Sequence, residues 1–279
     1  MAEKNANLPK YTVCMSVYSG ENPHFLQESL DSMFRQTHPC SELILVCDGQ
    51  LGDELNSVVD EFKRLYPDTF TVLQMKSGSG VGGCANAAIK RAKTEYIVKM
   101  DSDDIALENR CQRQLELMVK KPQLDMCGAF IEEFDSDSSQ AIAIKRTPLT
   151  HREILEYSKR RNPFNNQTLV YKKSAAIKAG GYSKFRRCED YDFVVRMLSS
   201  GAVGENIPEV LVRYRVTQSN LERRKNFNNT RSFISVRWRI FRSGYSSFVD
   251  FLIPTVAQLA LFVLPKSLTG KLYRKFLRK

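Results

Sequence analysis

Residues 96–105 read YIVKMDSDDI, an apolar and partly β-branched run that ends in three aspartates. The run predicts a buried strand over Tyr96–Met100, with Asp101, Asp103 and Asp104 at its carboxyl end. Carboxylates this close repel one another, and a bound cation or cationic ligand commonly offsets the repulsion. Ligands of open α/β sheets bind outside the carboxyl ends of strands, which is where this cluster is expected.

Two interpretations of the acidic cluster stay open on its spacing alone. In the first, a divalent cation binds the aspartates and grips a diphosphate. Mg²⁺ and Mn²⁺ prefer oxygen ligands and are commonly held by one or two carboxylates together with substrate phosphates. In the second, the aspartates only cap a helix that begins near Ala106, because aspartate is a favoured N-cap residue. The choice between them depends on the rest of the chain.

The composition is that of a folded protein with a hydrophobic core, since 42% of the 279 residues are hydrophobic and 26% are charged. The seven cysteines are scattered, without a CxxC pair or histidines at metal-ligand spacing. We therefore expect free thiols in a reducing compartment, and neither a disulfide framework nor a zinc site. The first ten residues lack the apolar core of a signal peptide, which favours a cytoplasmic protein.

The net charge of +11 is concentrated near the end of the chain. Residues 211–279 have a balance of +13, whereas residues 1–210 have a balance of −2. Within the basic part, Phe248–Leu264 is apolar but short and interrupted for a bilayer span, and a cationic cluster follows it. This combination predicts a helix on an anionic membrane surface, at the cytosolic face. A helix packed on the domain, or RNA binding, are the alternatives.

Strand-like and helix-like segments alternate through the first half of the chain. We expect strands at 11–18, 43–47, 70–75, 96–100 and 126–134, with helices beginning near 23, 53, 84 and 106. Alternation of this kind predicts an α/β protein with a doubly wound, mostly parallel sheet. Beyond residue 150 we expect a capping box at Thr150 and Glu153, a short strand at 168–171, a helix at 190–200 and an edge strand at 210–216.

A glycine motif, Gly78-x-Gly80-x-x-Gly83, formally matches the dinucleotide-binding fingerprint. That fingerprint belongs in the first strand–helix turn, with one acidic residue at the end of the next strand. Here it follows the third expected strand, and the next strand ends in three carboxylates. We expect the glycines to let the backbone pass close to a ligand or a neighbouring strand. An NAD(P)-binding oxidoreductase remains an alternative.

Two further polar clusters follow expected strand ends or precede helices. Asp48 ends the second strand, and could begin a turn or accept hydrogen bonds from a nucleotide base in a crevice lined by Ser16 and Tyr18. The sequence CEDYD at 188–192 could cap a helix, or supply a general base that takes a proton from an acceptor hydroxyl. A glycoside hydrolase would also use two distant acidic groups, but would leave Asp48 unexplained.

Five motifs, in this order and spacing, resemble family 2 of the inverting glycosyltransferases. They are VCMSVYSGE, LILVCDG, SGSGVGGCANAAI, YIVKMDSDD, and GGY followed by EDYDFVVRM. The resemblance covers residues 11–216. The segments NPFNNQTLVYKKSAAIKAGGY and YRVTQSNLERR are similar to bacterial enzymes of exopolysaccharide, capsule and O-antigen assembly.

The resemblance implies a nucleotide-diphospho-sugar transferase (GT-A) fold over residues 1–216. It places the nucleotide-binding half at about 11–104 and the acceptor half, with the catalytic base, at about 105–216. Residues 217–279 would then be a basic, helical, membrane-associating extension. No QxxRW signature of processive synthases occurs, which favours the transfer of one sugar per encounter.

The resemblance also implies roles for individual residues. These are uracil binding by Asp48 beside Ser16 and Tyr18, binding of Mn²⁺ or Mg²⁺ on the diphosphate by Asp103, contact with the ribose or metal by Asp101, and base catalysis by Asp190 supported by Glu189. Two positions depart from the family pattern. Cys47 replaces the first of two usual aspartates, and Val216–Gln218 stands where many relatives carry a histidine.

The expected activity is metal-dependent, inverting hexosyl or N-acetylhexosaminyl transfer from a UDP-sugar. The expected acceptor is a hydroxyl of a saccharide linked to polyprenyl diphosphate. A base on the face opposite the leaving diphosphate gives inversion in one displacement. The alternative from another class is a nucleic-acid-binding or scaffold protein on a degenerate transferase fold. Intact Asp48, Asp103 and Asp190 argue against degeneracy, so nucleic acid is not expected as a partner.

Overall fold

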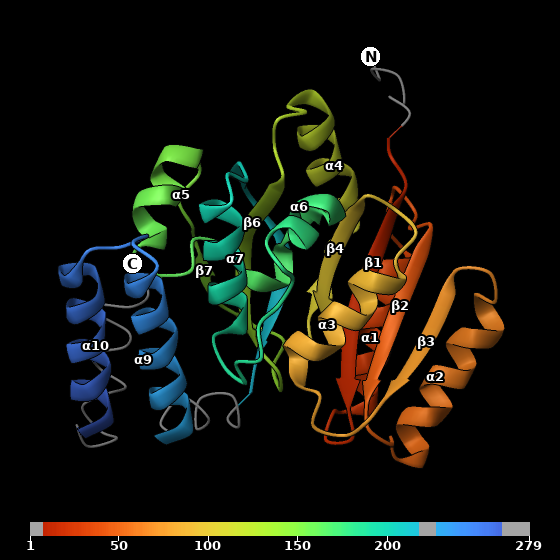
Figure 1. Cartoon of the computed structure of the whole chain (residues 1–279). Coiled ribbons are helices and arrows are strands. Elements are labelled where there is room, and N and C mark those ends of the chain that lie inside the picture. The colour runs from red at the N-terminus through yellow and green to blue at the C-terminus, as the bar shows by residue number, and fades with distance from the viewer. Residues whose placement is uncertain (1–7, 218–226, 264–279) are drawn as a thin grey trace.

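The computed structural model describes residues 8–217 and 227–263, which form one continuous sheet covered by helices on both faces (Figure 1). The sheet has nine strands in the order β3-β2-β1-β4-β8-β6-β9-β5, and β7 pairs with β6. Their bounds are β1 Tyr11–Tyr18, β2 Glu42–Asp48, β3 Phe70–Met75, β4 Tyr96–Asp101, β5 Ile105–Ala106, β6 Met126–Asp135, β7 Ala141–Lys145, β8 Val170–Lys172 and β9 Gly204–Val216.

The first four strands of the order are parallel, and their register aligns the polar strand ends. Ser16 on β1 pairs with Asp101 on β4, and Tyr18 pairs with Asp48 on β2. The parallel half of the sheet therefore brings its polar residues to one edge, as expected for a ligand crevice. Beyond β4, β8 is antiparallel to both of its neighbours, so the sheet is mixed.

Helices cover both faces of the sheet. They are α1 Pro23–Phe34, α2 Asp53–Leu65, α3 Gly80–Arg91, α4 Arg110–Lys120, α5 His151–Ser158, α6 Lys173–Lys178, α7 Glu189–Ser199, α9 Phe227–Arg242 and α10 Phe248–Val263. Side chains of a strand alternate between faces, so Val13 joins one core with α1, α2 and α4, while Cys14 joins the other with α3, α5, α6 and α7. The predicted doubly wound sheet is confirmed.

Several local predictions hold. The first helix begins at Pro23 as expected, where Asn22 accepts a hydrogen bond from the His24 amide, and Thr150 with Glu153 forms the expected capping box. All seven cysteines are free thiols, and six of them are buried. No helix in the described ranges is long and apolar enough to cross a bilayer.

Other local predictions are wrong, most clearly around the acidic turn. The helix expected near Ala106 begins at Arg110, because Ile105–Ala106 instead form the two-residue strand β5, which pairs with β9. The strand β9 starts at Gly204, earlier than expected, and is not an edge strand because β6 flanks it on its other side. The strand β7 was not foreseen. Pairings over such short segments are decided by tertiary contacts that local sequence does not encode.

A helical pair, α9 and α10, lies at the opposite end of the sheet from α2 (Figure 1). The helix α9 packs on α7 through Tyr191 and Val195 from α7 and Val236 and Ile240 from α9. Aromatic rings join α10 to α9, with Trp238 and Phe251 centroids 5.4 Å apart. Residues 227–242 and 248–263 are helical, and a separate membrane-associating extension stays a prediction. The basic cluster beyond Leu264 lies outside the described residues.

Candidate active site

The turn after β4 sends its three carboxylates into different surroundings. Asp104 is fully buried, and one of its oxygens accepts the backbone N–H of Arg215 at 2.9 Å. Burial first, and then the neighbouring Asp103 and Asp101, raise the pKa of Asp104 well above its usual value. Asp104 neither caps a helix nor faces the crevice, so its role is to hold the turn against β9.

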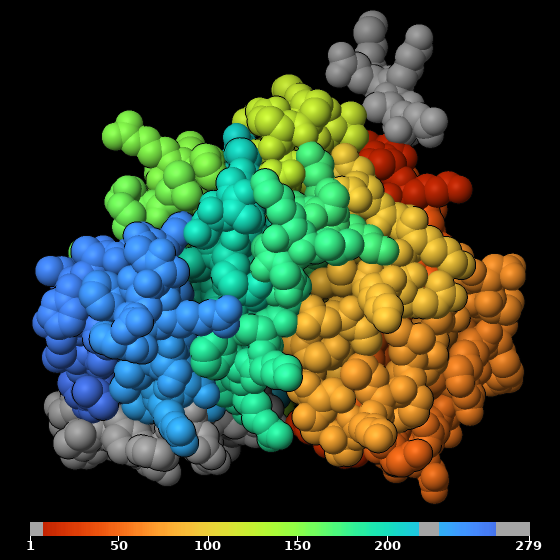
Figure 2. All heavy atoms as spheres, in the orientation of Figure 1, coloured from red at the N-terminus to blue at the C-terminus, as the bar shows by residue number. Residues whose placement is uncertain are grey.

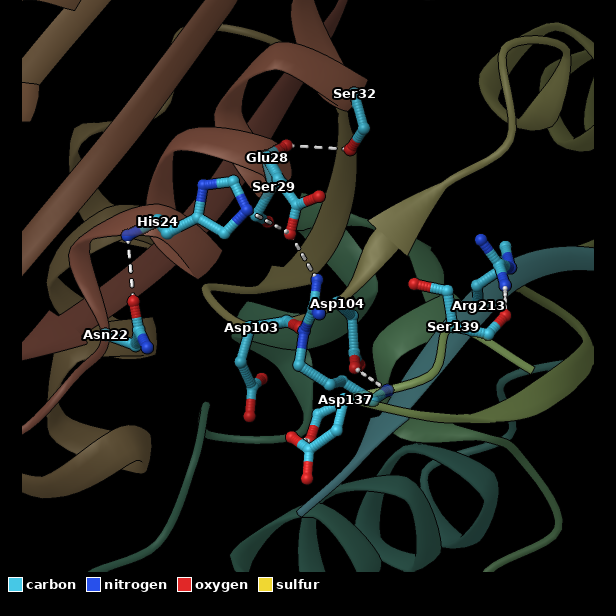
Figure 3. A network of polar contacts seen from close by, with 12 residues as sticks. Asn22, His24, Glu28, Ser29, Ser32, Asp103, Asp104, Asp137, Ser139 and Arg213 are labelled. Atoms are coloured by element: carbon cyan, nitrogen blue, oxygen red, sulfur yellow. Dashed lines mark hydrogen bonds and ion pairs between the residues drawn. The ribbon is translucent and has the colours of Figure 1, made fainter. Parts of the chain in front are cut away.

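A buried arginine, Arg215, fastens this turn to α1. It is 3% exposed, and its Nε donates to the Asp103 carbonyl at 2.8 Å while Nη2 donates to Glu28 at 2.6 Å. The guanidinium also lies 4.0 Å from the centroid of the Phe25 ring. Figure 3 shows Glu28, Asp103 and Asp104 close to one another in this part of the structure. In the sequence Arg215 occurs only within the segment YRVTQSNLERR, and no local pattern indicates its role.

A buried lysine, Lys99, offsets part of the charge at the turn. Lys99 is 5% exposed and its ammonium forms an ion pair with Asp101. Among residues 8–217 and 227–263, no cation forms an ion pair with Asp103. Burial, Asp101 and Glu21 raise the pKa of Asp103 to about 7. The turn therefore holds more negative charge than its own cations neutralise.

The carboxylate of Asp48 fastens the glycine-rich loop. Its two oxygens accept the backbone N–H groups of Ser79 and Gly80 at 2.8 and 2.9 Å, at the beginning of α3. The N–H groups in the first turn of a helix have no partner within the helix, so they favour an anion there. The next residue, Gly49, has φ of +93°, and a Cβ there would lie 2.9 Å from the Ser77 Cβ. Uracil binding by Asp48 stays a prediction, and the structure adds a loop-holding role.

The two remaining donor-side residues lie on β1. Ser16 and Lys99 line a small cavity between β1, β4 and α3. Tyr18 is 41% exposed at the strand end, so its ring has a face open to solvent. Both positions agree with the predicted crevice, and their contacts with a nucleotide stay predictions.

The third acidic cluster divides by role at the start of α7. Asp192 is 1% exposed and pairs with Arg196 at 2.8 Å and Arg239 at 3.3 Å, so it is structural. Asp190 accepts a hydrogen bond from the Asn162 amide at 3.0 Å. Burial, and then Asp190, raise the pKa of the adjacent Glu189 to about 7. Glu189 and Asp190 are thus the pair available for chemistry.

The start of α7 and the start of α3 are in contact. A Cβ built on Gly82 of α3 would lie 3.1 Å from the Ser183 carbonyl and 3.6 Å from the Glu189 Cγ. The start of α7 is therefore held against the glycine-rich end of α3. Lys99 lowers the pKa of both Asp103 and Glu189, which places its charge near both carboxylates. The structure thus brings the predicted donor side and acceptor side together.

The described residues contain no group of three or more His, Cys, Asp or Glu side chains that could hold a metal ion. Asp101 and Asp103 supply at most two carboxylates. Mg²⁺ is commonly bound by one or two carboxylates plus substrate phosphates. Burial, and then the nearby carboxylates Asp101 and Glu21, raise the pKa of Asp103, and a bound cation would offset both effects. The residues therefore fit a divalent cation shared with a phosphate ligand, and do not fit one held by the protein alone.

The profile of Glycosyl transferase family 2 matches residues 12–187, and the chain belongs to this family. It is 32% identical to the Escherichia coli UDP-Gal:alpha-D-GlcNAc-diphosphoundecaprenol beta-1,3-galactosyltransferase, over 97% of this chain and 98% of that one. It is 29% identical to the amylovoran biosynthesis glycosyltransferase AmsE of Erwinia amylovora, over 95% and 98% of the two chains.

Solved structures share the GT-A fold at low identity. The mannosyltransferase PcManGT from Pyrobaculum calidifontis, in complex with GDP-Man and Mn²⁺, superposes with a TM-score of 0.67 at 15% identity, covering 98% of this chain and 81% of that one. S. aureus TarS 1–349 in complex with UDP gives 0.61 at 16% identity, over 81% and 65%. The predicted GT-A fold is confirmed.

Replacing Arg215 tests its role in holding the turn. We expect Arg215→Gln to lower the free energy of unfolding by about 3 kcal/mol, because it leaves buried acceptors without their donor. Arg213→Gln is the matched control, since Arg213 lies two residues away in the same strand and forms a part-exposed pair with Glu132. It should cost less than about 1 kcal/mol. Equal losses in urea denaturation would contradict the role given to Arg215.

Proposed function

We propose that this protein transfers one sugar from a UDP-sugar to a hydroxyl of a saccharide carried on a polyprenyl diphosphate, with inversion at the anomeric carbon. The observation that carries the proposal is the meeting of the β4 turn and the start of α7 at one site. The former offers Asp101 and Asp103 to a cation and a diphosphate, and the latter offers Asp190 to an acceptor. The named activity of the E. coli relative and the UDP complex of TarS support this choice of substrates.

On the donor side, negative charge develops on the diphosphate as the anomeric bond breaks. A divalent cation, Mn²⁺ or Mg²⁺, would stabilise that charge when bound. Asp103 would hold it, with Asp101 as a second carboxylate or as a ribose contact. Tyr18 and Ser16 would lie along the nucleoside, and Asp48 would keep the glycine-rich loop in place while meeting the base. The ion pair of Lys99 with Asp101 offsets the repulsion between Asp101 and the neighbouring carboxylates.

On the acceptor side, Asp190 would take the proton from the attacking hydroxyl. The Asn162 amide holds its carboxylate in one orientation, which a general base requires. Glu189 is the support for that base. Because its pKa is raised to about 7, Glu189 can carry a proton near neutral pH and so spare Asp190 a second adjacent charge.

The donor side is tested by calorimetry with UDP, with and without Mn²⁺. We expect tight binding only with the metal, and affinity that weakens by up to about tenfold per pH unit below pH 7, because protons compete with the cation for Asp103. Asp103→Asn should remove both the metal dependence and this pH dependence. Asp60→Asn, an exposed change on α2, is the control and should change neither.

The alternatives give other results in the same assay. No UDP binding by the folded protein under either condition would reject the uridine assignment. Preference for NAD(P) over UDP would indicate an oxidoreductase. Salt-dependent RNA binding without metal-dependent UDP binding would indicate a nucleic-acid-binding protein on a degenerate fold.

We further propose that α10 attaches the enzyme to an anionic membrane surface from the cytoplasmic side. Its outward face carries an aliphatic stripe at helical spacing, in which every member is 42–55% exposed: Val249, Leu252, Ile253, Val256 and Leu259. A helix that packs only against its own domain would bury such a stripe. Pro254 lies within the helix, and the Thr255 hydroxyl donates a hydrogen bond to the Phe251 carbonyl at 2.7 Å. An exposed aliphatic stripe on one side suits a helix that lies in the membrane interface.

Flotation with liposomes tests this attachment. Ile253→Glu should reduce the fraction bound to phosphatidylglycerol vesicles at least about fivefold, because it places a charge in the aliphatic stripe. Ile177→Glu is the matched control, since Ile177 is 60% exposed on α6, away from the stripe. Equal loss with both variants, or no binding by the unaltered protein, would reject the proposal.

A further inference from the structure

A second pocket lies beside the segment that leads to the candidate base. It lies between the segment before α7 and the first turns of α9, and has a volume of about 560 Å³. Figure 2 shows that segment, in green, between α3 and α9. The residues that line the pocket are Lys184, Phe185, Arg186, Arg187, Asn229, Arg231, Ser232 and Ser235.

The pocket has an uncompensated positive charge. Four of its lining residues are cations and none is an acid. Lys184, Arg186, Arg187 and Arg231 are all exposed, and none of them forms an ion pair with a carboxylate within residues 8–217 and 227–263. Like charges gathered without a counterion repel one another, so an anionic ligand would stabilise this arrangement.

A larger pocket elsewhere shows what a compensated basic surface looks like in the same protein. It has a volume of about 770 Å³ and lies beside α5. Three acids, Glu153, Glu156 and Asp250, line it together with its cations, and Lys159 pairs with Glu156 at 2.8 Å while Arg160 pairs with Asp250 at 2.6 Å. The number of cations therefore does not distinguish the two pockets. They differ because acids line the larger pocket and none lines the other.

The position of the uncompensated pocket relates it to the acceptor. Arg187 directly precedes the segment 188–190 and lowers the pKa of Glu189, so its charge acts on the residue next to the candidate base. At the far side, Gln258 of α10 donates to Thr230 of α9 at 3.3 Å, next to Arg231. The end of α10 that carries Leu259 thus lies beside the pocket. The pocket is placed between the acceptor side of the site and the proposed membrane helix.

We propose that this pocket binds the diphosphate of the lipid-linked acceptor. Arginine guanidinium groups form paired hydrogen bonds with phosphate oxygens, and Ser232 and Ser235 supply further hydroxyl donors. A diphosphate diester joins a sugar to a lipid, so its anion lies between a hydroxyl destined for the base and a chain destined for the membrane. The order of base, pocket and aliphatic stripe matches that order. The inference rests on the proposed function for the identity of the acceptor.

The test uses geranyl diphosphate, a water-soluble isoprenoid diphosphate, in calorimetric titrations of the full chain with and without saturating UDP and Mn²⁺. We expect binding in both conditions, because the donor diphosphate belongs to the β4 turn. The double change Arg186→Gln with Arg187→Gln, and separately Arg231→Gln, should each weaken binding at least about tenfold. UDP affinity should stay within about twofold. Arg242→Gln, an exposed arginine at the other end of α9, is the control and should bind as the unaltered protein does.

Competitors separate the possible sources of the anion. Inorganic pyrophosphate should displace geranyl diphosphate, geranyl monophosphate should bind at least about tenfold more weakly, and geraniol should not bind. Displacement by UDP would place the ligand in the donor site and overturn the proposal. Unchanged binding by the pocket variants would do the same. If these variants instead lose binding to an RNA oligonucleotide while geranyl diphosphate never binds, the pocket serves a nucleic acid and the proposal is wrong.

If UDP fails to bind but geranyl diphosphate binds through these arginines, the pocket assignment stands and the donor assignment falls. The opposite result retains the donor site and rejects the pocket. The two proposals therefore fail separately.

Discussion

The site depends on two buried cations beside the acidic turn after β4. Three carboxylates within four residues would repel one another in a part-buried position, and that arrangement is stable because Lys99 pairs with Asp101 and Arg215 ties the turn to α1 and β9. These contacts give Asp104 a structural role. Asp103 has no ion-pair partner among the residues that the structure describes. The residual charge at Asp103 is what a cation with a diphosphate would neutralise.

Hydrogen bonds and close packing hold the next part of the crevice together. Asp48 holds the start of α3, and the start of α3 in turn packs against the segment that leads into α7. Two hydrogen bonds between Asn86 and the Tyr182 backbone, at 2.8 and 2.7 Å, reinforce that contact. These contacts hold Asp48, the start of α3 and the segment before α7 in one arrangement. Catalysis needs such positioning, since small displacements of reacting groups are costly.

Sequence patterns reach the fold and the location of the site because both follow from periodicity and strand ends. Alternating apolar runs predict the parallel half of the sheet, and Asp48, Asp101 and Asp190 fall where strands end or helices begin. Side-chain partners follow from tertiary contacts, so the sequence alone could not assign Asp104 to the β9 backbone. It likewise could not separate Asp192 from Asp190, because neighbours in a helix face different surroundings. The sequence shows Arg215 only as an arginine near the end of a strand, and its bonds to Asp103 and Glu28 depend on tertiary contacts.

The most direct test of the account is the rate of sugar transfer by Asp190→Asn, measured with its affinity for UDP. UDP-galactose and a synthetic N-acetylglucosaminyl diphospholipid, the substrate types of the E. coli relative, are suitable substrates for this assay. The account predicts that kcat falls by about 10²–10⁴-fold, as for loss of a general base, while UDP affinity is unchanged. Transfer at the rate of the unaltered protein would contradict the assignment of Asp190 and with it the proposed mechanism.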